Sequence, residues 1–454
     1  MDYLEVVFSL KSVIANNDTE TFALVIRHAH PADIAAAIAK LNLEQQCRLL
    51  KLAEPAKRAE IFGYLSAELQ VRIANAIGRK PLVELFLHMS ADERADLYND
   101  LPEDQRDTVL PALAQIERED IRRLAAYPED QVGSVMTSDY ATLAPDLTAA
   151  AAIEELRRIA PDTETIYQAF VIDRNRRLIG TVSLRELIIA HAQSRIGDIM
   201  KPSPVAIKAD APREEAVQLI SKYDLLALPV INGGDMLVGI VTYDDALDVE
   251  QQETSEDFHK VASVGALGKS LREASVWLLF RKRVFWLLLL VFGNLFSGAG
   301  IAFFEDTIAA YIALVFFLPL LIDSGGNAGS QAATLMVRAL ATGEIVLRDW
   351  AGMLLRELFV ATLLGLSMAV AVSSLGLWRG GPEIAVVVAV SMQVIVITGS
   401  VIGMSLPFLL SKFKLDPATA SAPLITSIAD ALGVIIYFTI ATTMLDMSVL
   451  EMGV

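Results

Sequence analysis

The first 128 residues place apolar side chains at three- and four-residue spacing, in stretches of about a dozen residues. Examples are HPADIAAAIAKL, LEQQCRLLKLA and SAELQVRIANAIG, with Pro, Ser, Asp or Glu near the first turn. This pattern predicts short amphipathic helices. Because one such unit cannot bury its apolar face alone, a stacked, superhelical repeat domain is expected over residues 1–128.

The pattern changes after Tyr127. YQAFVIDRNRRLIGTVSLREL predicts two apolar strands joined at Asp173 to Arg176 and then a helix, and LLALPVINGGDMLVGIVTYDDAL repeats this arrangement with Gly233 and Gly234 in the turn. A helical run, LTAAAAIEELRRI or PREEAVQLISKY, precedes each copy. The duplication predicts two α/β domains, 129–190 and 191–250, packed as a pseudo-symmetric pair.

Residues 251–280 are predicted to form a long connecting helix, and residues 281–454 an all-α transmembrane domain with five helices per subunit. Each apolar segment is long enough to cross a hydrocarbon core of about 30 Å. The predicted segments are 284–304, 308–339, 351–378, 384–410 and 420–444.

The net charge also differs between the first 280 residues and the predicted transmembrane domain. Of 454 residues, 54% are hydrophobic and 20% charged, with a net charge of -17. Residues 281–454 hold nine Lys/Arg and eleven Asp/Glu, so 15 of the 17 net negative charges lie in the first 280 residues. Such an acidic surface argues against nucleic acid as a partner and favours cations.

Basic residues predict the orientation in the lipid bilayer. They flank the first segment and follow the second and fourth, which puts the N-terminal domains in the cytoplasm and the C-terminus outside. The basic residues are Arg281, Lys282, Arg283, Arg338, Arg348, Lys412 and Lys414. The acidic start MDYLEVVFSL predicts no cleaved signal. An enzyme is not expected, since the five histidines are scattered without metal-ligand spacing.

Polar residues interrupt the apolar segments. DSGGNAGSQ lies within the second segment, and Pro319, Pro407 and Pro423 each remove a backbone donor. Two interpretations are open: a broken backbone beside buried carboxylates that forms a cation site, or close helix packing through small residues. Asp323 and Asp430 are costly against lipid, at about 2.5 to 3.5 kcal/mol each.

Asp430 favours the cation site. It follows Asp416 by fourteen residues, about 21 Å along a helix, and therefore lies near the middle of the bilayer. Since no Lys or Arg within the membrane segments presents itself as a partner, a mobile cation is the remaining counter-charge.

The paired repeats resemble tandem CBS domains, whose G-h-h-T/S-x-x-D/E ending matches two places. These are Gly180, Ser183 and Glu186 in the first copy and Gly239, Thr242 and Asp245 in the second. The resemblance implies nucleotide binding, with Thr242 as a candidate ligand and ATP as an open possibility. Glu186 departs from the usual Asp, which weakens that expectation for the first copy.

LPLLIDSGGNAGSQ, LDPATASAP and TSIADALGVIIYF, after a helical domain and a CBS pair, resemble the MgtE family of magnesium channels and transporters. The resemblance implies a homodimer in the inner or plasma membrane that moves Mg²⁺, with Asp430 in the pore and Asp416 at its cytoplasmic mouth. SAP at Ser421 to Pro423 departs from the expected SGP. The candidate pore-lining residues are Gly325, Gly326, Asn327, Gln331, Asp323, Pro423 and Thr426.

The resemblance also implies regulation by cytoplasmic Mg²⁺, bound where the helical domain, the CBS pair and the connecting helix meet. Asp92 and Asp96 lie one helical turn apart and share a face, although a solvated face is the alternative on spacing alone. The candidate regulatory ligands are Asp92, Asp96, Asp224, Asp245, Asp248, Glu256 and Asp257. Filling this site is expected to close the pore, a negative feedback on transport.

Two other functions remain open from the sequence. A carrier for Mn²⁺ or Co²⁺ is possible because oxygen ligands discriminate weakly among such cations. A membrane receptor that senses nucleotide through its CBS pair, without transport, predicts that Asp430→Ala leaves activity intact.

Overall fold

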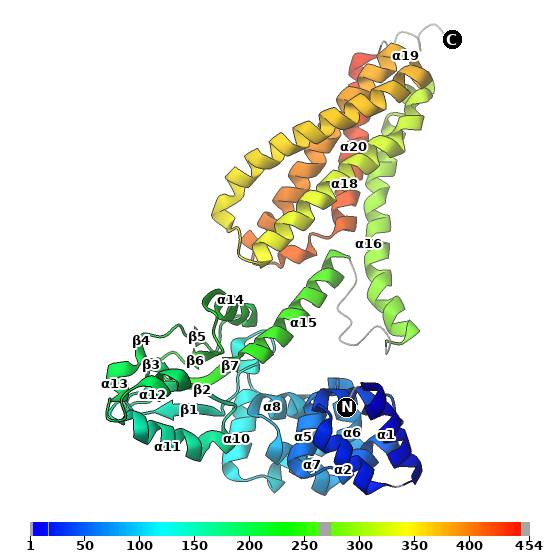
Figure 1. Ribbon diagram of the computed structural model, residues 1–454. Helices are drawn as coiled ribbons and strands as arrows, with labels where there is room; N and C mark the ends of the chain where they lie inside the picture. Colours follow the sequence, from blue (N-terminus) through cyan, green and yellow to red (C-terminus); the bar gives the residue numbers. More distant parts are fainter. Residues whose placement is uncertain (1–2, 17, 263–273, 446–454) are drawn as a thin grey trace. The chain divides into compact units, whose positions relative to one another are not determined.

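The computed structural model describes residues 3–16, 18–262 and 274–445 (Figure 1). The chain divides into two compact units, Met1–Gln251 and Gln252–Val454. The first contains the helical domain and the two α/β repeats, and the second the apolar helices.

The helical domain is a stack in which most helices pack against the second helix along the chain, as α1 does on α3, α5 on α7 and α6 on α8. Its core includes Phe22, Phe62 and Phe86, all nearly inaccessible to solvent. The elements are α1 (Tyr3–Asn16), α2 (Thr19–His28), α3 (Pro31–Ile38), α4 (Leu43–Leu52), α5 (Pro55–Gly63), α6 (Ala67–Ile77), α7 (Arg79–His88), α8 (Ala91–Asp100), α9 (Glu103–Val109), the 3-10 turn η1 (Leu110–Ala112) and α10 (Gln115–Leu124).

Capping residues explain where these helices begin. The Asp18 carboxylate accepts hydrogen bonds from the backbone N–H groups of Glu20 and Thr21, at 3.1 and 3.0 Å. Asn42 and Gln45 form a reciprocal capping box at the start of α4. These side chains satisfy donors that have no partner within the helix, so each short helix has a defined start. The stack confirms the predicted helical domain.

The two α/β repeats have matching topology. In each, a parallel strand pair is followed by an antiparallel hairpin: β1-β2-β3, extended by β4, and β5-β6-β7. The first contains η2 (Val132–Ser134), β1 (Tyr140–Leu143), α11 (Ala149–Ile159), η3 (Ala160–Asp162), β2 (Thr165–Ile172), β3 (Leu178–Ser183) and α12 (Leu184–Ile189). Then follow α13 (Ile196–Ile199), β4 (Lys201–Pro202), β5 (Ile207–Lys208), α14 (Arg213–Tyr223), β6 (Ala227–Ile231), β7 (Leu237–Thr242) and α15 (Tyr243–Val261).

The repeats pack on each other through their hairpins. Leu178 donates its N–H to the Asp235 carbonyl, and Leu237 donates to the Arg176 carbonyl, both at 3.1 Å. Phe170 lies in an apolar cluster shared by both copies. The predicted pseudo-symmetric pair is therefore confirmed.

The second unit contains α16 (Val276–Phe303), α17 (Glu305–Ala310), α18 (Ala313–Ala341), η4 (Leu347–Asp349), α19 (Trp350–Lys412), η5 (Pro417–Thr419) and α20 (Ala422–Met444). Within the described residues, four helices are long and apolar enough to cross a membrane. The predicted connecting helix differs in its bounds: α15 begins at Tyr243, directly after β7, and residues 263–273 of the prediction lie outside the described residues.

The 63-residue helix α19 doubles back on itself (Figure 1). Its chain reverses at Gly381, where φ is +80°, a conformation that favours glycine. A Cβ at Gly376 would lie 2.7 Å from Ala385 Cα, and Gln393 donates to the Thr362 carbonyl at 3.3 Å, so the halves are antiparallel neighbours. The two halves of α19 correspond to the third and fourth predicted segments. That the chain crosses the membrane five times remains a prediction.

Of the two interpretations of the second apolar segment, the broken backbone is wrong and close helix packing is what the structure shows. Helix α18 runs without interruption through DSGGNAGSQ, with Pro319 inside it. Pro423 lies in the first turn of α20, where a missing N–H costs no helical bond. The glycines serve packing instead, because α18 and α19 approach each other closely where Gly325 and Gly329 face Gly399 and Gly403.

Candidate functional site

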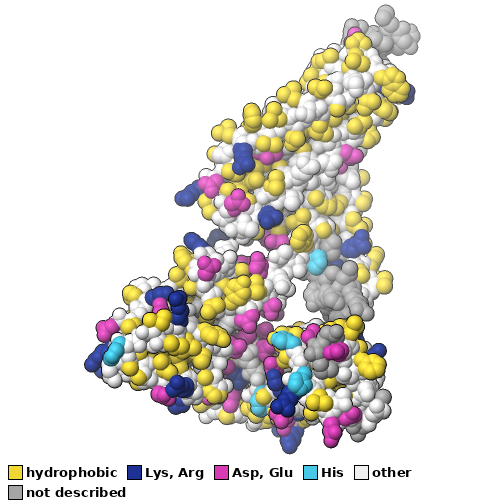
Figure 2. Space-filling view, viewed as in Figure 1, with side chains coloured by type: hydrophobic (Ala, Val, Ile, Leu, Met, Phe, Trp, Pro, Cys, Tyr) yellow, Lys and Arg dark blue, Asp and Glu magenta, His cyan; other side chains and the backbone are white. Residues whose placement is uncertain are grey.

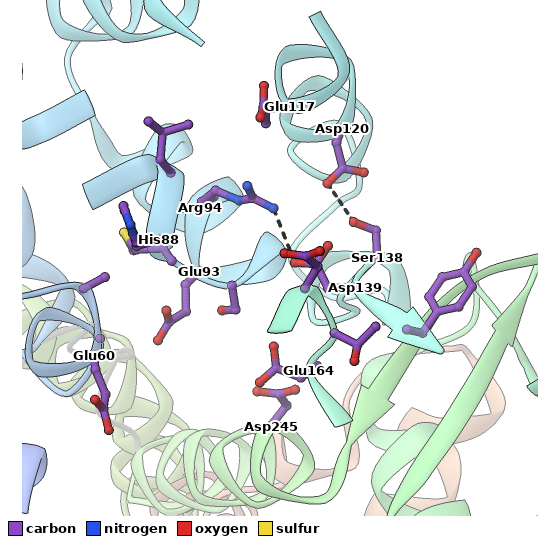
Figure 3. Close-up of a pocket in the computed structure, with 18 of the residues that line it drawn as sticks. Glu60, His88, Glu93, Arg94, Glu117, Asp120, Ser138, Asp139, Glu164 and Asp245 are labelled. Atoms are coloured by element: carbon purple, nitrogen blue, oxygen red, sulfur yellow. Dashed lines mark hydrogen bonds and ion pairs between the residues drawn. The ribbon is translucent and has the colours of Figure 1, made fainter. Parts of the chain in front are cut away.

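An acidic cavity of about 1490 Å³ lies in the first unit, between the helical domain and the CBS-like repeats (Figure 3). Acidic side chains from both parts gather on this hollow (Figure 2). They are Glu60, Glu93, Glu117, Glu119, Asp120, Asp139, Asp162, Glu164, Asp244, Asp245 and Asp248. The same wall carries the arginines Arg94, Arg123 and Arg176. The acids far outnumber these bases, so the cavity attracts cations.

Two helix starts bring acids to this region. Asp92 and Glu93 lie in the first turn of α8, and Asp244 and Asp245 in the first turn of α15. Carboxylates are favoured at these positions because the N-terminal end of a helix is partly positive. Two segments distant in sequence thus carry neighbouring negative charges.

The negative charge of Asp92 acts on most of the neighbouring carboxylates, which form one charge group with it. Burial, and then the charge of Asp92, raise the pKa of Asp245 to about 8 and that of Glu93 to about 7. The same two causes raise the pKa of Glu164 to about 7. Burial also raises the pKa of Asp92 itself, and the charge of Asp244 adds to this. These carboxylates therefore repel one another when ionised.

The group extends along both helices. Burial ranks first and the charge of Asp92 second in raising the pKa of Asp96 to about 7, although Asp96 keeps an exposed surface. Burial and the charge of Asp244 raise the pKa of Asp248. Arg94 offsets part of the negative charge, since its guanidinium lies 3.4 Å from Asp139.

Figure 3 shows Glu164 and Asp245 pointing toward each other from the two repeats. Even so, no three acidic, histidine or cysteine side chains in the described ranges are placed to hold one metal ion together. A ready-made multidentate site is thus absent from that part of the chain. Mg²⁺ does not require one, because it keeps several waters and binds through one or two carboxylates.

The predicted regulatory residues fall into three groups. Asp245 and Asp248 line the cavity, whereas Asp92 and Asp96 are not part of its wall and belong to the site only through their charges. Asp224 is exposed at the left-handed end of α14, with φ +51°, and is not part of the cavity wall. Glu256 and Asp257 lie in the second unit of the chain and are described below.

Sequence reasoning missed Glu93, Glu164 and Asp244. Glu93 and Asp244 adjoin predicted residues, so the doublets DE and DD were available as a signal. Glu164 precedes β2 and reaches the cavity through the fold of the first repeat, which spacing does not reveal.

In the second unit, one lysine lies between Asp416, predicted at the pore mouth, and Glu256, predicted as a regulatory ligand. Lys260 Nζ lies 2.6 Å from Asp416 Oδ2 and 2.8 Å from Glu256 Oε1. The other Asp416 oxygen accepts the Ala418 N–H at 2.8 Å, which caps η5. Burial, followed by the charge of Asp416, raises the pKa of Asp257 to about 6. Asp416, Glu256 and Asp257 are thus neighbours around one ammonium group.

Asp430 lies at the middle of α20 and is half-buried, next to the fully packed Ala429. Its carboxylate experiences the charge of Asp323 on α18. In the part of the chain that the structure describes, no Lys, Arg or His forms an ion pair with either aspartate.

The candidate pore-lining residues on α18 divide by face. Gly325 and Gly326 are buried against α19 and α20, so they present no open surface within this chain. Asp323, Asn327 and Gln331 are exposed. On α20, Pro423 and Thr426 are half-buried, and the Thr426 hydroxyl donates to the Pro423 carbonyl at 2.9 Å.

The two CBS-like endings differ in their hydrogen bonds. Thr242 Oγ1 lies 2.5 Å from carboxylate oxygens of both Asp244 and Asp245. In the first copy, Ser183 donates its N–H and its hydroxyl to Glu186, at 2.7 and 2.8 Å. Glu186 therefore serves as a capping residue of α12, and a ligand role for Thr242 stays a prediction.

Comparison with known families matches most of the chain, in four segments. Residues 29–130 match the MgtE intracellular N domain, and residues 132–192 and 196–251 each match the CBS domain. Residues 318–440 match the MgtE family, described as divalent cation transporters.

Curated relatives are similar over most of their length. "Magnesium transporter MgtE" of Thermus thermophilus is 40% identical over 329 residues, 72% of this chain and 73% of the relative. The Bacillus subtilis protein of the same name is 34% identical over 73% of this chain and 74% of its own length.

Solved structures resemble the first unit. The cytosolic domain of the Mg²⁺ channel MgtE in complex with ATP has a TM-score of 0.52 at 35% identity, and the match covers 54% of this chain and 99% of that one. The soluble part of a magnesium transporter has a TM-score of 0.53 at 26% identity, covering 56% and 99%.

Proposed function

The chain belongs to the MgtE family of magnesium transporters, and we propose that it conducts Mg²⁺ past Asp430 and closes when cytoplasmic Mg²⁺ binds its acidic cavity. The observation that carries the conduction path is an uncompensated carboxylate within an apolar helix. Asp430 lies eight residues into α20 from Ala422, in a helix long enough to span the bilayer.

The chemistry of Mg²⁺ fits such a carboxylate. The ion holds its waters tightly and binds through few carboxylates. Two copies of Asp430, one from each subunit of a homodimer, would balance its charge and leave room for hydration. The family resemblance implies this dimer, and α16, none of whose residues is buried within the chain, offers surface for the contact. A two-fold axis would bring the same surface of both copies together.

Mg²⁺ flux into liposomes tests the path. Purified protein with Asp430→Asn should lose at least about 100-fold in flux, since the negative charge that balances the hydrated Mg²⁺ would then be missing. Glu383→Gln, which removes an exposed acid beside the reversal of α19, is the matched control and should retain flux. Wild-type flux in Asp430→Asn would refute the proposed path.

Closure follows from repulsion in the acidic cavity. Without Mg²⁺, the ionised forms of Asp92, Asp245 and Glu164 disfavour close approach of the helical domain and the CBS pair. Bound divalent ions would reverse the sign of this interaction and hold the two parts together. We place a second group of ligands at Glu256, Asp257 and Asp416, where Mg²⁺ would compete with Lys260.

Feedback is tested by the inhibition of flux with Mg²⁺ on the cytoplasmic side. Asp92→Ala combined with Asp96→Ala should shift half-inhibition to higher Mg²⁺ by about tenfold or more, because the shared charge of the group is lost. Glu20→Ala with Glu44→Ala, two exposed acids elsewhere in the helical domain, should leave inhibition unchanged. Equal inhibition in both double variants would remove the cavity from the mechanism.

Two further parts complete the proposal. The protein is multi-pass, with a cytoplasmic N-terminus and an outside C-terminus in the inner or plasma membrane, as the distribution of Lys and Arg predicts. ATP binds the CBS pair, which is supported by the ATP complex of a related cytosolic domain. Thr242→Ala should weaken ATP binding in calorimetry.

Other divalent cations form the alternative cargo. The ion path offers oxygen ligands, which select weakly between Mg²⁺, Mn²⁺ and Co²⁺. Flux measured ion by ion in the same liposomes separates a Mg²⁺-selective path from a broader divalent carrier. A CBS receptor without transport predicts no flux at all.

A further inference from the structure

One face of α18 carries a polar stripe, formed by Asp323, Asn327, Gln331 and Thr334. All four are exposed and follow each other at three- or four-residue spacing. The stripe is about 16 Å long at the helical rise of about 1.5 Å per residue. The opposite faces are packed: Gly325 and Gly329 against α19, and Gly326 against Thr426 of α20.

The stripe begins at the level of Asp430. A Cβ at Gly326 would lie 3.0 Å from Thr426 Cγ2, and a Cβ at Gly433 would lie 3.7 Å from Ile322 Cγ1. Residues 322–326 of α18 therefore stand beside residues 426–433 of α20. Asp323 and Asp430 lie within these two spans, and their charges interact.

Lipid is a poor environment for this face. In hydrocarbon, the exposed carboxylate and the two primary amides of this line would lack partners, whereas the Thr334 hydroxyl donates to the Ser330 carbonyl at 2.9 Å. The carboxylate costs most. Asp323 has no ion pair among the described residues, and its charge acts on another carboxylate, that of Asp430. Water and a mobile cation satisfy the carboxylate and both amides, whereas lipid satisfies none of the three.

We infer that Asp323 is a second carboxylate of the conduction path and a determinant of its preference for divalent cations. This inference rests on the proposed function. Each chain then supplies two carboxylates at one level of the path, and a dimer four. Four negative charges exceed the charge of one Mg²⁺, so the path should discriminate strongly against monovalent ions and draw in a second divalent ion as the first leaves.

Liposome flux of Mg²⁺ and of Na⁺ tests this role. Asp323→Asn should raise the half-saturating Mg²⁺ concentration by about tenfold or more and increase Na⁺ flux relative to Mg²⁺ flux, because one negative charge per chain is removed. Asp323→Glu, which keeps the charge, should restore most of both values. Asp306→Asn, at an exposed acid on α17, is the control and should behave as wild type.

Each outcome decides a different question. Wild-type half-saturation and Na⁺ exclusion in Asp323→Asn, together with loss of flux in Asp430→Asn, would overturn the role of Asp323 and leave the proposed function standing. Retained flux in Asp430→Asn would overturn the proposed function itself. Asp323→Ser provides a second neutral side chain: if Asp323→Asn cannot be purified folded, unchanged selectivity in Asp323→Ser likewise overturns the inference.

Discussion

Gly329→Ala tests the close crossing of α18 and α19 with a single methyl group. A Cβ at this position would lie 2.6 Å from the carbonyl oxygen of Gly399 and 2.9 Å from Ile425 Cγ2. The carbonyl belongs to the backbone of a helix and cannot rotate away. The two helices must therefore separate to accept the methyl group, and the polar stripe would move with α18.

The magnitude follows from two opposing effects. Overpacking of a tight contact costs about 1 to 3 kcal/mol. Replacement of glycine by alanine inside a helix gains about 1 kcal/mol. Gly352→Ala should show only the stabilising effect of alanine in a helix, because no atom lies within 4 Å of a Cβ at this position. Relative to wild type, Gly352→Ala should be slightly more stable, and Gly329→Ala should lie about 1 to 3 kcal/mol below Gly352→Ala.

Thermal unfolding of both purified variants in one detergent measures this difference. Gly329→Ala should unfold at a temperature several degrees lower and should also conduct less Mg²⁺ in liposomes. If the two variants were equally stable and equally active, the glycine contact would not hold the membrane helices in place.

Three other results are expected. Without Mg²⁺, the first unit should lose stability progressively from about pH 4 to pH 8, because the raised pKa values of Glu164 and Asp245 favour the protonated folded form; thermal melts at several pH values should show this, and Mg²⁺ should protect most at the alkaline end. Lys260→Met should tighten Mg²⁺ binding around Asp416, measured as stronger inhibition from the cytoplasmic side, and weaker inhibition would contradict a competing ammonium. Phe170→Ala, at a fully buried side chain shared by the CBS pair, should destabilise the first unit by about 3 to 5 kcal/mol in denaturant titration.

Local patterns predicted most of the architecture. Apolar spacing and the Pro, Ser, Asp or Glu near each first turn identified the helical stack, and duplicated strand patterns identified the CBS pair. The prediction was wrong at DSGGNAGSQ, because helix-weakening residues were read without their tertiary context. Gly325 and Gly329 are compatible with a continuous helix there since a second glycine-lined helix packs against them.

In the candidate sites too, the sequence predicted residues marked by local spacing and missed those placed by the tertiary fold. Asp92 and Asp96 could be paired from a spacing of four, and Asp430 could be singled out from its depth in an apolar segment. Glu164 could not be predicted as a site residue from the sequence, since its position depends on how the first repeat folds back toward the helical domain. Lys260 was also overlooked, because its partner Asp416 lies 156 residues further along the chain.

The tight reversal at Gly381 constrains how the protein is made. The two halves of α19 are joined directly at Gly381, between the charged residues Arg379 and Glu383. So short a connection keeps the halves together, and we expect them to insert into the membrane as a single hairpin. A larger side chain at Gly381, where φ is +80°, is expected to impair this insertion.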